Sequence, residues 1–260
     1  MSIQKIVDGF VKSGTTATGS VPDTWSQGRT TYGGLTAMLC LMAAEQLAEG
    51  RSLRSASIGF VGPCSGELEI SAEVIRAGRT AATVRAQVKS ELGPGTEALF
   101  TFSSNRESVL SQPGERADIA PPDANTPPVP PFPGGPGFTQ NLEYVWVSEA
   151  TPFSGHGSPS LRSWVRMRDP ESREHPLSLL CLADALPPAV SASMTDRAPV
   201  SSMTWMLDFY DDKPTTENGW WLLDATSEFA QGGHSSQDMT IWNSRGECVA
   251  KGRQLITLFV

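Results

Sequence analysis

One acidic side chain stands where the sequence otherwise predicts a buried helix. Asp184 lies inside the apolar run LLCLADALPP. A buried carboxylate is unfavourable unless hydrogen-bond partners or a chemical task accompany it. We therefore interpret Asp184 as a candidate base, or a water-orienting acid, that faces a cleft. The alternative is a carboxylate at the end of the helix that reaches solvent.

Two further places carry groups that could serve a ligand. Gln254 lies in the last strand-like run, VAKGRQLITLFV, where the pattern turns apolar, although it could equally be an ordinary polar residue of a strand. The segment Arg29–Gly34 (RTTYGG) leads directly into an apolar helix. A Gly-Gly pair there lets backbone N–H groups approach a ligand at the positive end of the helix dipole. The same segment could also be a plain tight turn.

Other catalytic patterns are missing from the sequence. It has no GxGxxG after a strand, no GxxxxGK[ST] and no GxSxG, which argues against a phosphate loop and against a nucleophile elbow. The four cysteines (Cys40, Cys64, Cys181 and Cys248) are far apart, and no histidine lies at ligand spacing from them. We expect no metal and no disulfide, and a chain kept reduced in the cytoplasm.

The composition is that of a globular acidic protein. The 260 residues are 39% apolar and 18% charged, with a formal net charge of −8. This balance excludes disorder and argues against nucleic acid as a partner. The longest apolar stretch is well below the roughly 20 residues that a membrane span needs. Residues 1–14 have no apolar core, so we expect no signal peptide.

The elements that must position the candidate residues occur in the same order twice. Leu35–Ala48 predicts a helix that is buried nearly all round, and Leu177–Ala185 predicts a second apolar helix that ends at Pro187 and Pro188. Strand-like runs follow the first helix at 53–61, 67–76, 80–89 and 98–103, and the second at 200–209, 220–227, 235–242 and 248–259. A helix followed by a long antiparallel meander, present twice, indicates an internal duplication.

A proline-rich segment separates the two copies. Nine of the 20 prolines lie between Pro113 and Pro136, a composition that forms neither a helix nor a central strand. The predicted organisation is an N-terminal unit over residues 1–108, a linker over 109–139 and a C-terminal unit over 140–260.

Together, these motifs resemble the acyl-CoA thioesterase II (TesB-like) family of tandem hotdog proteins. The first half carries TYGGLTAMLCLMAAEQL and then Phe60–Pro63 and Gly78–Arg79 in the family's order. The second half carries LADALPPAV, PVSSMTWMLDFY and the run from WWLLDATSEF to VAKGRQ. The resemblance covers nearly the whole chain apart from the proline-rich linker.

The resemblance implies a fold and an activity. The fold is an α+β double hotdog, in which two long buried helices are each wrapped by an antiparallel sheet. The activity is hydrolysis of acyl-CoA to a free fatty acid and CoA, without a cofactor or a metal. Because a tandem chain supplies both halves of a hotdog pair, we expect its helices to lie side by side under one continuous sheet. The exposed edge strands predict a monomer or a homodimer.

The resemblance also implies a site. The family's catalytic Asp matches Asp184, its strand hydroxyl matches Ser202, and its final-strand Gln matches Gln254. Ser202 replaces the more usual Thr, and Thr204 is a rival on the same face of the strand. A carboxylate, a hydroxyl and a carboxamide can activate and hold a water for attack on a thioester.

The start of the first helix completes the predicted site. Tyr32, Gly33 and Gly34 match the family's aromatic-Gly-Gly motif and are the expected substrate-binding residues. The sequence departs from well-studied bacterial members at Ala185, where those have a His. Two alternatives therefore remain: a binding protein for acyl-CoA or an acyl-lipid that has lost turnover, and a hotdog enoyl-CoA hydratase. The hydratase pattern would need a His at the position of Ala189.

Overall fold

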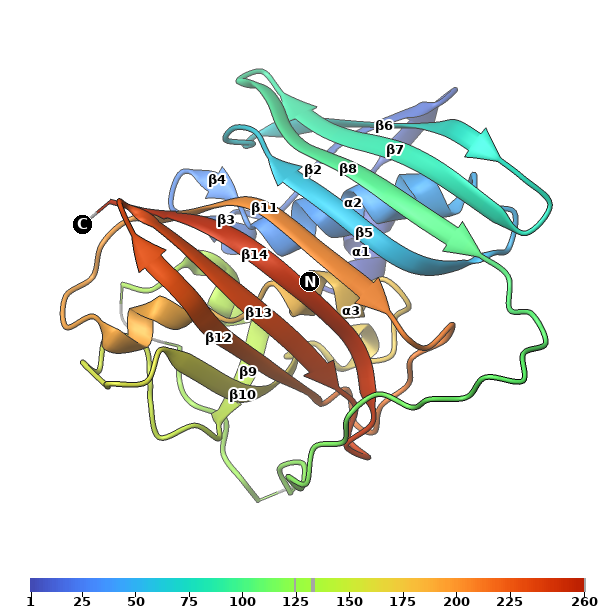
Figure 1. Ribbon diagram of the computed structural model, residues 1–260. Helices are drawn as coiled ribbons and strands as arrows, with labels where there is room; N and C mark the ends of the chain where they lie inside the picture. Colours follow the sequence, from blue (N-terminus) through green and yellow to red (C-terminus); the bar gives the residue numbers. More distant parts are fainter. Residues whose placement is uncertain (124, 132–133, 260) are drawn as a thin grey trace.

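The computed structural model describes residues 1–123, 125–131 and 134–259. Twelve strands form one sheet in the order β1-β2-β6-β7-β8-β5-β11-β14-β13-β12-β10-β9, and every pairing in it is antiparallel (Figure 1). The six strands from the first half are β1 (Val11–Ser13), β2 (Thr16–Ser20), β5 (Ser52–Phe60), β6 (Glu67–Ala77), β7 (Ala81–Ser90) and β8 (Gly93–Ser103). Those from the second half are β9 (Leu142–Trp146), β10 (Ser160–Met167), β11 (Val200–Phe209), β12 (Trp221–Gln231), β13 (His234–Trp242) and β14 (Cys248–Leu258).

The two halves are joined at the centre of this sheet. Strand β5 pairs with β11 from Thr204 opposite Gly59 to Asp208 opposite Ser55. On either side of this seam the order is mirrored, with β8, β7 and β6 on one side and β14, β13 and β12 on the other. The single continuous sheet expected of a tandem chain is present.

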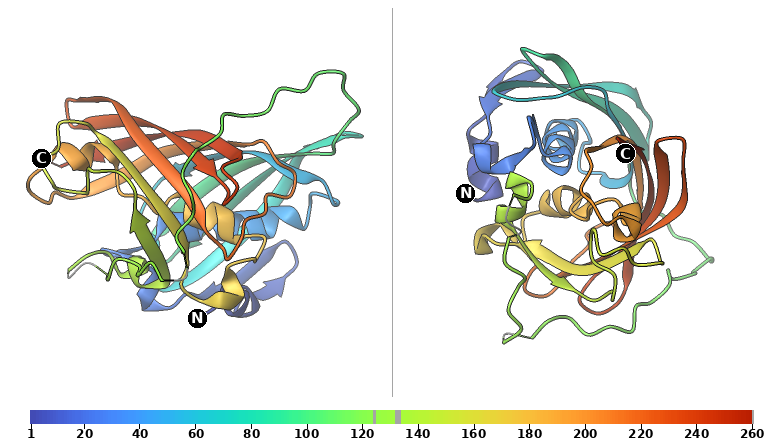
Figure 2. Two further views of the ribbon diagram at one scale, coloured as in Figure 1. Left: turned by 90° about the horizontal axis from the view of Figure 1, so that it is seen from below. Right: turned by 90° about the vertical axis from the view of Figure 1, so that its left-hand side faces the viewer.

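The sheet curves around two helices, α2 (Gly33–Glu45) and α3 (Ser178–Ala183) (Figure 2). Nearly all of α2 and the whole of α3 are buried, and the two helices pack against each other. The prediction of two long helices is wrong for the second one, which has six residues. Pro187 and Pro188 have no backbone N–H to donate to the carbonyl oxygens four residues earlier, so the helix cannot continue past this point.

The remaining elements are short. A first helix, α1 (Ile3–Asp8), lies near the N-terminus, and β3 (Ser26–Gln27) pairs with β4 (Thr30–Thr31) just before α2. Single 3-10 turns cover Asp23–Trp25, Gly137–Asn141, Pro170–Ser172 and Ala189–Ser193. Within the described residues, no helix combines the length and the apolar character that a membrane crossing requires.

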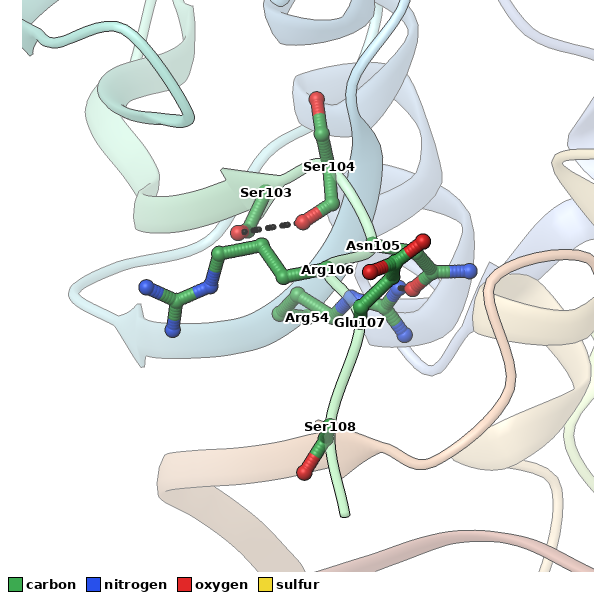
Figure 3. Close-up of a pocket in the computed structure, with 7 residues that line it drawn as sticks. All are labelled: Arg54, Ser103, Ser104, Asn105, Arg106, Glu107 and Ser108. Carbon is green, nitrogen blue, oxygen red and sulfur yellow. Dashed lines mark hydrogen bonds between the residues drawn. The ribbon is translucent and has the colours of Figure 1, made fainter. Parts of the chain in front are cut away.

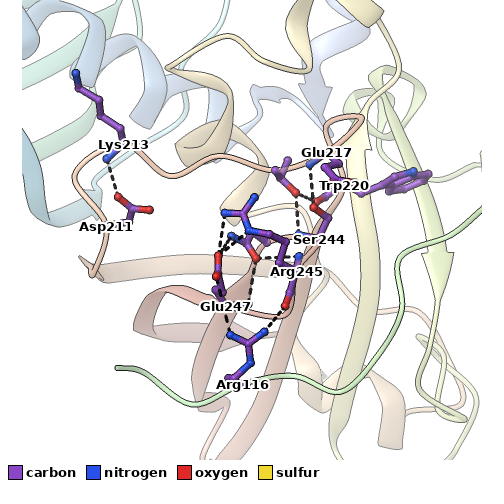
Figure 4. Close-up of polar contacts among 10 residues, drawn as sticks. Arg116, Asp211, Lys213, Glu217, Trp220, Ser244, Arg245 and Glu247 are labelled. Carbon is purple, nitrogen blue, oxygen red and sulfur yellow. Dashed lines mark hydrogen bonds and ion pairs between the residues drawn. The ribbon is translucent and has the colours of Figure 1, made fainter. Parts of the chain in front are cut away.

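After β8 the chain runs along the outside of the molecule to the turn between β13 and β14, and its proline-rich part continues from there toward β9 (Figure 1). Its described residues between 104 and 136 form no named helix or strand. Arg116 anchors it, because its guanidinium donates to the Arg245 carbonyl oxygen at 2.7 Å and its backbone forms a bridge with Glu247 (Figure 4). Three residues of the predicted linker, Ala124, Phe132 and Pro133, lie outside the described residues.

Candidate active site

Asp184 is the residue at which helix α3 ends. Its backbone has left helical geometry, with φ −94° and ψ 11°, and the Ala185 N–H closes the last turn on the Leu182 carbonyl oxygen at 2.9 Å. The side chain is partly buried between α3, the start of α2 and the inner face of the sheet. The short helix and its proline stop therefore fix the position of the carboxylate.

Gln254 connects Asp184 to the sheet. It lies on the inner face of β14 and is only 3% exposed. Its Nε2 donates to Asp184 Oδ1 at 2.9 Å and to Ser202 Oγ at 2.9 Å. The three residues that the sequence predicts as catalytic are thus brought together from α3, β11 and β14 by one carboxamide group.

A β-bulge on β11 separates the two candidate hydroxyl groups. The register of β11 against β14 shifts between Ser202 and Thr204, which leaves Met203 as the extra residue. A bulge breaks the alternation of side chains along a strand. Ser202 therefore faces inward toward Gln254, while Thr204 is exposed on the other face. The expectation that both hydroxyls share one face is wrong because of this extra residue.

The glycines at the start of α2 let that helix approach Asp184 closely. The Gly34 N–H donates to the Asp184 carboxylate. A Cβ atom on Gly33 would lie 2.9 Å from Asp184 Oδ2, closer than side chains pack. A Cβ on Gly34 would collide with the Cys181 carbonyl oxygen in α3. A larger residue at Gly34 would push the two helices apart, and one at Gly33 would displace the side chains of Asp184 and Phe60.

Tyr32 lies in the core just behind this contact. Its side chain is fully buried, and its ring stacks on Phe138 with 3.9 Å between ring centroids. Its hydroxyl donates to the Cys181 carbonyl oxygen at 2.8 Å. The aromatic residue of the TYGG motif therefore ties the start of α2 to α3.

The surroundings of Asp184 make it a weak acid. Burial raises its pKa from 3.8 to about 7, and the hydrogen bonds from Gln254 and Gly34 oppose part of this rise. Burial, followed by the nearby charge of Asp184, also raises the pKa values of Tyr32, Tyr144 and Cys181 above their ordinary values. These three groups stay uncharged near neutral pH, where Asp184 itself can exchange a proton.

Sequence reasoning did not identify a second glutamine at the site. Gln237 lies directly opposite Gln254 in the pairing of β13 with β14 and is fully buried. Its Nε2 donates to Gln254 Oε1 at 2.8 Å, and its own Oε1 accepts from the Ala189 N–H at 2.8 Å. In the sequence it stands among polar strand residues, SSQDMT. The only available signal was its inward phase, shared with Met239 and Ile241.

Two hollows lie away from these residues. A shallow one of about 400 Å³ is lined by Arg54 and residues 103–108 at the end of β8 (Figure 3). A larger cavity of about 810 Å³ has apolar side chains from both helices, among them Leu41 and Leu180, with charged groups such as Arg51 and Arg173 around them. Neither is lined by Asp184, Ser202 or Gln254.

Comparison with known families accounts for both halves of the chain. A family model described as the acyl-CoA thioesterase N-terminal domain matches residues 21–103, and one described as the acyl-CoA thioesterase C-terminal domain matches residues 119–258. The chain belongs to the acyl-CoA thioesterase family. Membership places it among the thioester hydrolases, with acyl-CoA as the family's substrate. No curated protein matches the sequence of this thioesterase.

Solved structures show the fold that this thioesterase shares with other proteins. A conserved protein of unknown function with hot dog fold from Alicyclobacillus acidocaldarius superposes with a TM-score of 0.85 at 20% identity, covering 100% of this chain and 99% of that one. The acyl-CoA thioesterase II TesB2 from Mycobacterium marinum gives 0.75 at 20% identity, covering 99% and 98%. The dehydratase domain of RzxB from Pseudomonas fluorescens gives 0.55 at 11% identity, covering 95% and 96%. The predicted hotdog fold is confirmed.

Proposed function

We propose that the protein hydrolyses acyl-CoA to a free fatty acid and CoA with a water that Asp184, Ser202 and Gln254 activate and hold. The observation that carries this proposal is the Gln254 carboxamide, which donates to Asp184 and Ser202 at once. Because Ser202 Oγ accepts from Gln254, its own O–H is left to donate to a third group. A water held between that hydroxyl and Asp184 would have its proton acceptor and its orientation fixed together.

The reaction needs one proton acceptor, which later becomes a proton donor. Asp184 takes a proton from the water as its oxygen attacks the thioester carbonyl carbon, and the carbonyl oxygen becomes an oxyanion. When the tetrahedral intermediate collapses, the C–S bond breaks and the CoA sulfur takes the proton from Asp184. A carboxyl whose pKa lies near 7 suits both steps at neutral pH.

The start of α2 is the proposed oxyanion site. The first N–H groups of a helix have no acceptor within the helix and carry its positive dipole end. The Gly34 N–H already donates to Asp184, which leaves the N–H of Gly33, a residue that lies against the Asp184 carboxylate, as the proposed donor for the oxyanion. The role that we propose for the Tyr32-Gly33-Gly34 motif is therefore divided, with Tyr32 holding the helix and the glycines facing the reaction.

The remaining expectations belong to the same proposal. We propose a hotdog unit over residues 1–108, a linker over 109–139 and a second hotdog unit over 140–260, which together act as a cytoplasmic monomer or homodimer on a small-molecule substrate rather than on nucleic acid. The net charge of −8 and the four free cysteines support this proposal.

The test is release of thiol from a panel of acyl-CoA thioesters of different chain length, followed with a thiol-detecting reagent. We expect saturable release of CoA with at least one thioester. Tight binding without thiol release would instead indicate an acyl-CoA binding protein. Consumption of an enoyl-CoA without thiol release would indicate a hydratase, although the side chain of Ala189 offers no acid or base in that role.

A further inference from the structure

We propose that Gln237 is a positioning residue, which sets the orientation of the Gln254 carboxamide and through it the geometry of Asp184 and Ser202. This inference rests on the proposed hydrolytic site and adds to it a fourth residue that does not touch the substrate. The observations behind it are a line of four hydrogen bonds and the burial of both glutamines.

The orientation of the Gln237 carboxamide is set by a backbone N–H group, which can only donate a hydrogen bond. The Ala189 backbone N–H points at Gln237 Oε1 at 2.8 Å. A flipped Gln237 would present its NH₂ group to this N–H, so that two donors would face each other in a buried place. The carbonyl end of the Gln237 side chain is therefore fixed toward Ala189, in the 3-10 turn that follows the Leu-Pro-Pro segment.

The fixed orientation passes to Gln254. With its oxygen toward Ala189, Gln237 presents its NH₂ group to Gln254 Oε1 at 2.8 Å. Gln254 must then present its own NH₂ group to Asp184 Oδ1 and Ser202 Oγ. A flipped Gln254 would place its carbonyl oxygen against a carboxylate, which would repel it and leave the Asp184 charge without this donor.

Both carboxamides are held where solvent cannot substitute for a lost partner. Gln237 is fully buried and Gln254 is 3% exposed, on adjacent strands and directly opposite each other. Packing alone would not distinguish the two flip states of Gln254, because the oxygen and nitrogen ends of a carboxamide have nearly the same size. The hydrogen bond from Gln237 at one end and the bond to Asp184 at the other distinguish them, and the Gln237 bond does so whether or not Asp184 carries its charge.

The first experiment removes the hydrogen bonds but keeps the length of the side chain. In Gln237→Met we expect kcat for CoA release to fall about 10-fold to 100-fold, the cost known for partners that orient metal ligands, which we carry over to this carboxamide. We expect KM to change little, because Gln237 does not touch the substrate. The acidic limb of the pH profile should move to higher pH, because the Gln254 bond lowers the pKa of Asp184.

A double-mutant cycle tests whether Gln237 acts through Gln254. If it does, adding Gln237→Met to Gln254→Ala changes kcat no further, since the group to be oriented is already gone. Ser235→Ala is the matched control: Ser235 is equally buried on the same strand and bonds only to Ser227 among the polar side chains described. It should leave kcat and the pH profile unchanged. Effects of Gln237→Met and Gln254→Ala that simply multiply would overturn the proposal.

A second variant keeps the inference testable if Gln237→Met does not fold. In Gln237→Glu, a protonated carboxyl can donate to Gln254 Oε1 while its other oxygen accepts from Ala189, but the ionised form cannot donate. Relative to wild type at the same pH, we expect this variant to be most active at acidic pH and to lose activity as pH rises. A Glu variant as impaired at low pH as at high pH would overturn the proposal.

Failure of this inference and failure of the proposed function give different results. Wild-type rates in Asp184→Asn would refute the proposed hydrolytic site itself. Loss of activity in Asp184→Asn together with wild-type kcat in Gln237→Met would support the proposed hydrolytic site and refute only the positioning role of Gln237.

Discussion

The two halves of the sheet carry residues of different chemical character at equivalent positions. In the second half, Gln254 on β14 pairs with Gln237 on β13 and with Trp205 on β11. In the first half, Phe100 on β8 pairs with Val84 on β7 and with Ala56 on β5. We call these two sets of cross-strand neighbours the polar row (Gln237, Gln254, Trp205) and the apolar row (Val84, Phe100, Ala56). They lie at matching places on either side of the β5–β11 pairing, where Ala56 is opposite Leu207 and Trp205 is opposite Ile58.

The helices show the same contrast. Leu39-Cys40-Leu41 in α2 and Leu180-Cys181-Leu182 in α3 are the same three residues in buried helices. Two residues later stand Ala43 and Asp184, respectively. The two halves thus share one framework. In the first half the row is apolar, and in the second half it carries polar groups that are connected by hydrogen bonds. Buried polar groups are tolerated there because each has a partner.

The largest effect that this comparison predicts belongs to Asp184. Asp184→Asn keeps the size of the side chain and removes the proton acceptor, so we expect kcat for CoA release to fall about 10²-fold to 10⁴-fold with KM little changed. The fold should survive, as judged by circular dichroism. A near-normal rate would mean that the polar row of the second half is not the active site.

Matched truncations in the two rows separate stability from activity. Phe100→Ala should cost about 3–5 kcal/mol of unfolding free energy by opening a cavity in the apolar row. Gln254→Ala should lower kcat about 10-fold to 100-fold and cost less stability, about 1–3 kcal/mol, through the partner that it leaves unpaired. Denaturant unfolding and thiol-release kinetics on both variants provide the comparison. Equal losses of kcat in the two would contradict a division of labour between the halves.

The bulge on β11 predicts a smaller difference between neighbouring hydroxyls. Ser202→Ala removes a group bonded to Gln254, and we expect a loss of activity smaller than that of Asp184→Asn because the hydroxyl orients the water without taking its proton. Thr204→Ala changes an exposed side chain on the other face and should leave kcat close to wild type. Steady-state rates of the two variants under identical conditions decide this point. A larger loss of activity in Thr204→Ala than in Ser202→Ala would show that β11 pairs with β14 in a different register in solution.

The last predicted effect concerns stability instead of rate, and its sign follows from the pKa of Asp184. The Asp184 carboxyl keeps its proton up to about pH 7 when folded but only to about pH 4 when unfolded. Its contribution to stability therefore falls as pH rises through that interval and stays low above it. Asp184→Asn should be more stable than wild type at pH 8 by up to about 4 kcal/mol, because each unit of the pKa shift corresponds to about 1.4 kcal/mol, and the difference should shrink toward pH 4. Thermal unfolding of both proteins at several pH values measures it.

Much of this framework could be predicted from the sequence. The run predicted at 200–209 is strand β11 itself, and the run at 248–259 ends one residue beyond β14, because alternating apolar residues between glycine-rich turns define a half-buried strand. Strands β9 and β10 were not predicted. Their residues LEYVW and SLRSWVRM mix charged and aromatic side chains, some of which meet only in the folded state, as Arg166 does with Trp220.

The site was predictable in its members but not in its connections. Asp184 and Gln254 stand out as polar residues in apolar runs, and the family resemblance adds Ser202. The bulge at Met203 leaves no mark in the sequence, so the choice between Ser202 and Thr204 needed the pairing of β11 with β14. Gln237 resembles any polar strand residue until its hydrogen bonds to Gln254 and Ala189 are visible.

The central claim is that Asp184 is the group that accepts the proton from water. The most direct test is the pH dependence of kcat/KM for CoA release, measured from about pH 5 to pH 9 on the wild-type protein and on Asp184→Asn. We expect an acidic limb with an apparent pKa of about 7 in the wild type, and a residual rate in the variant that lacks this limb. The same limb in both proteins would contradict the assignment of Asp184 as the base.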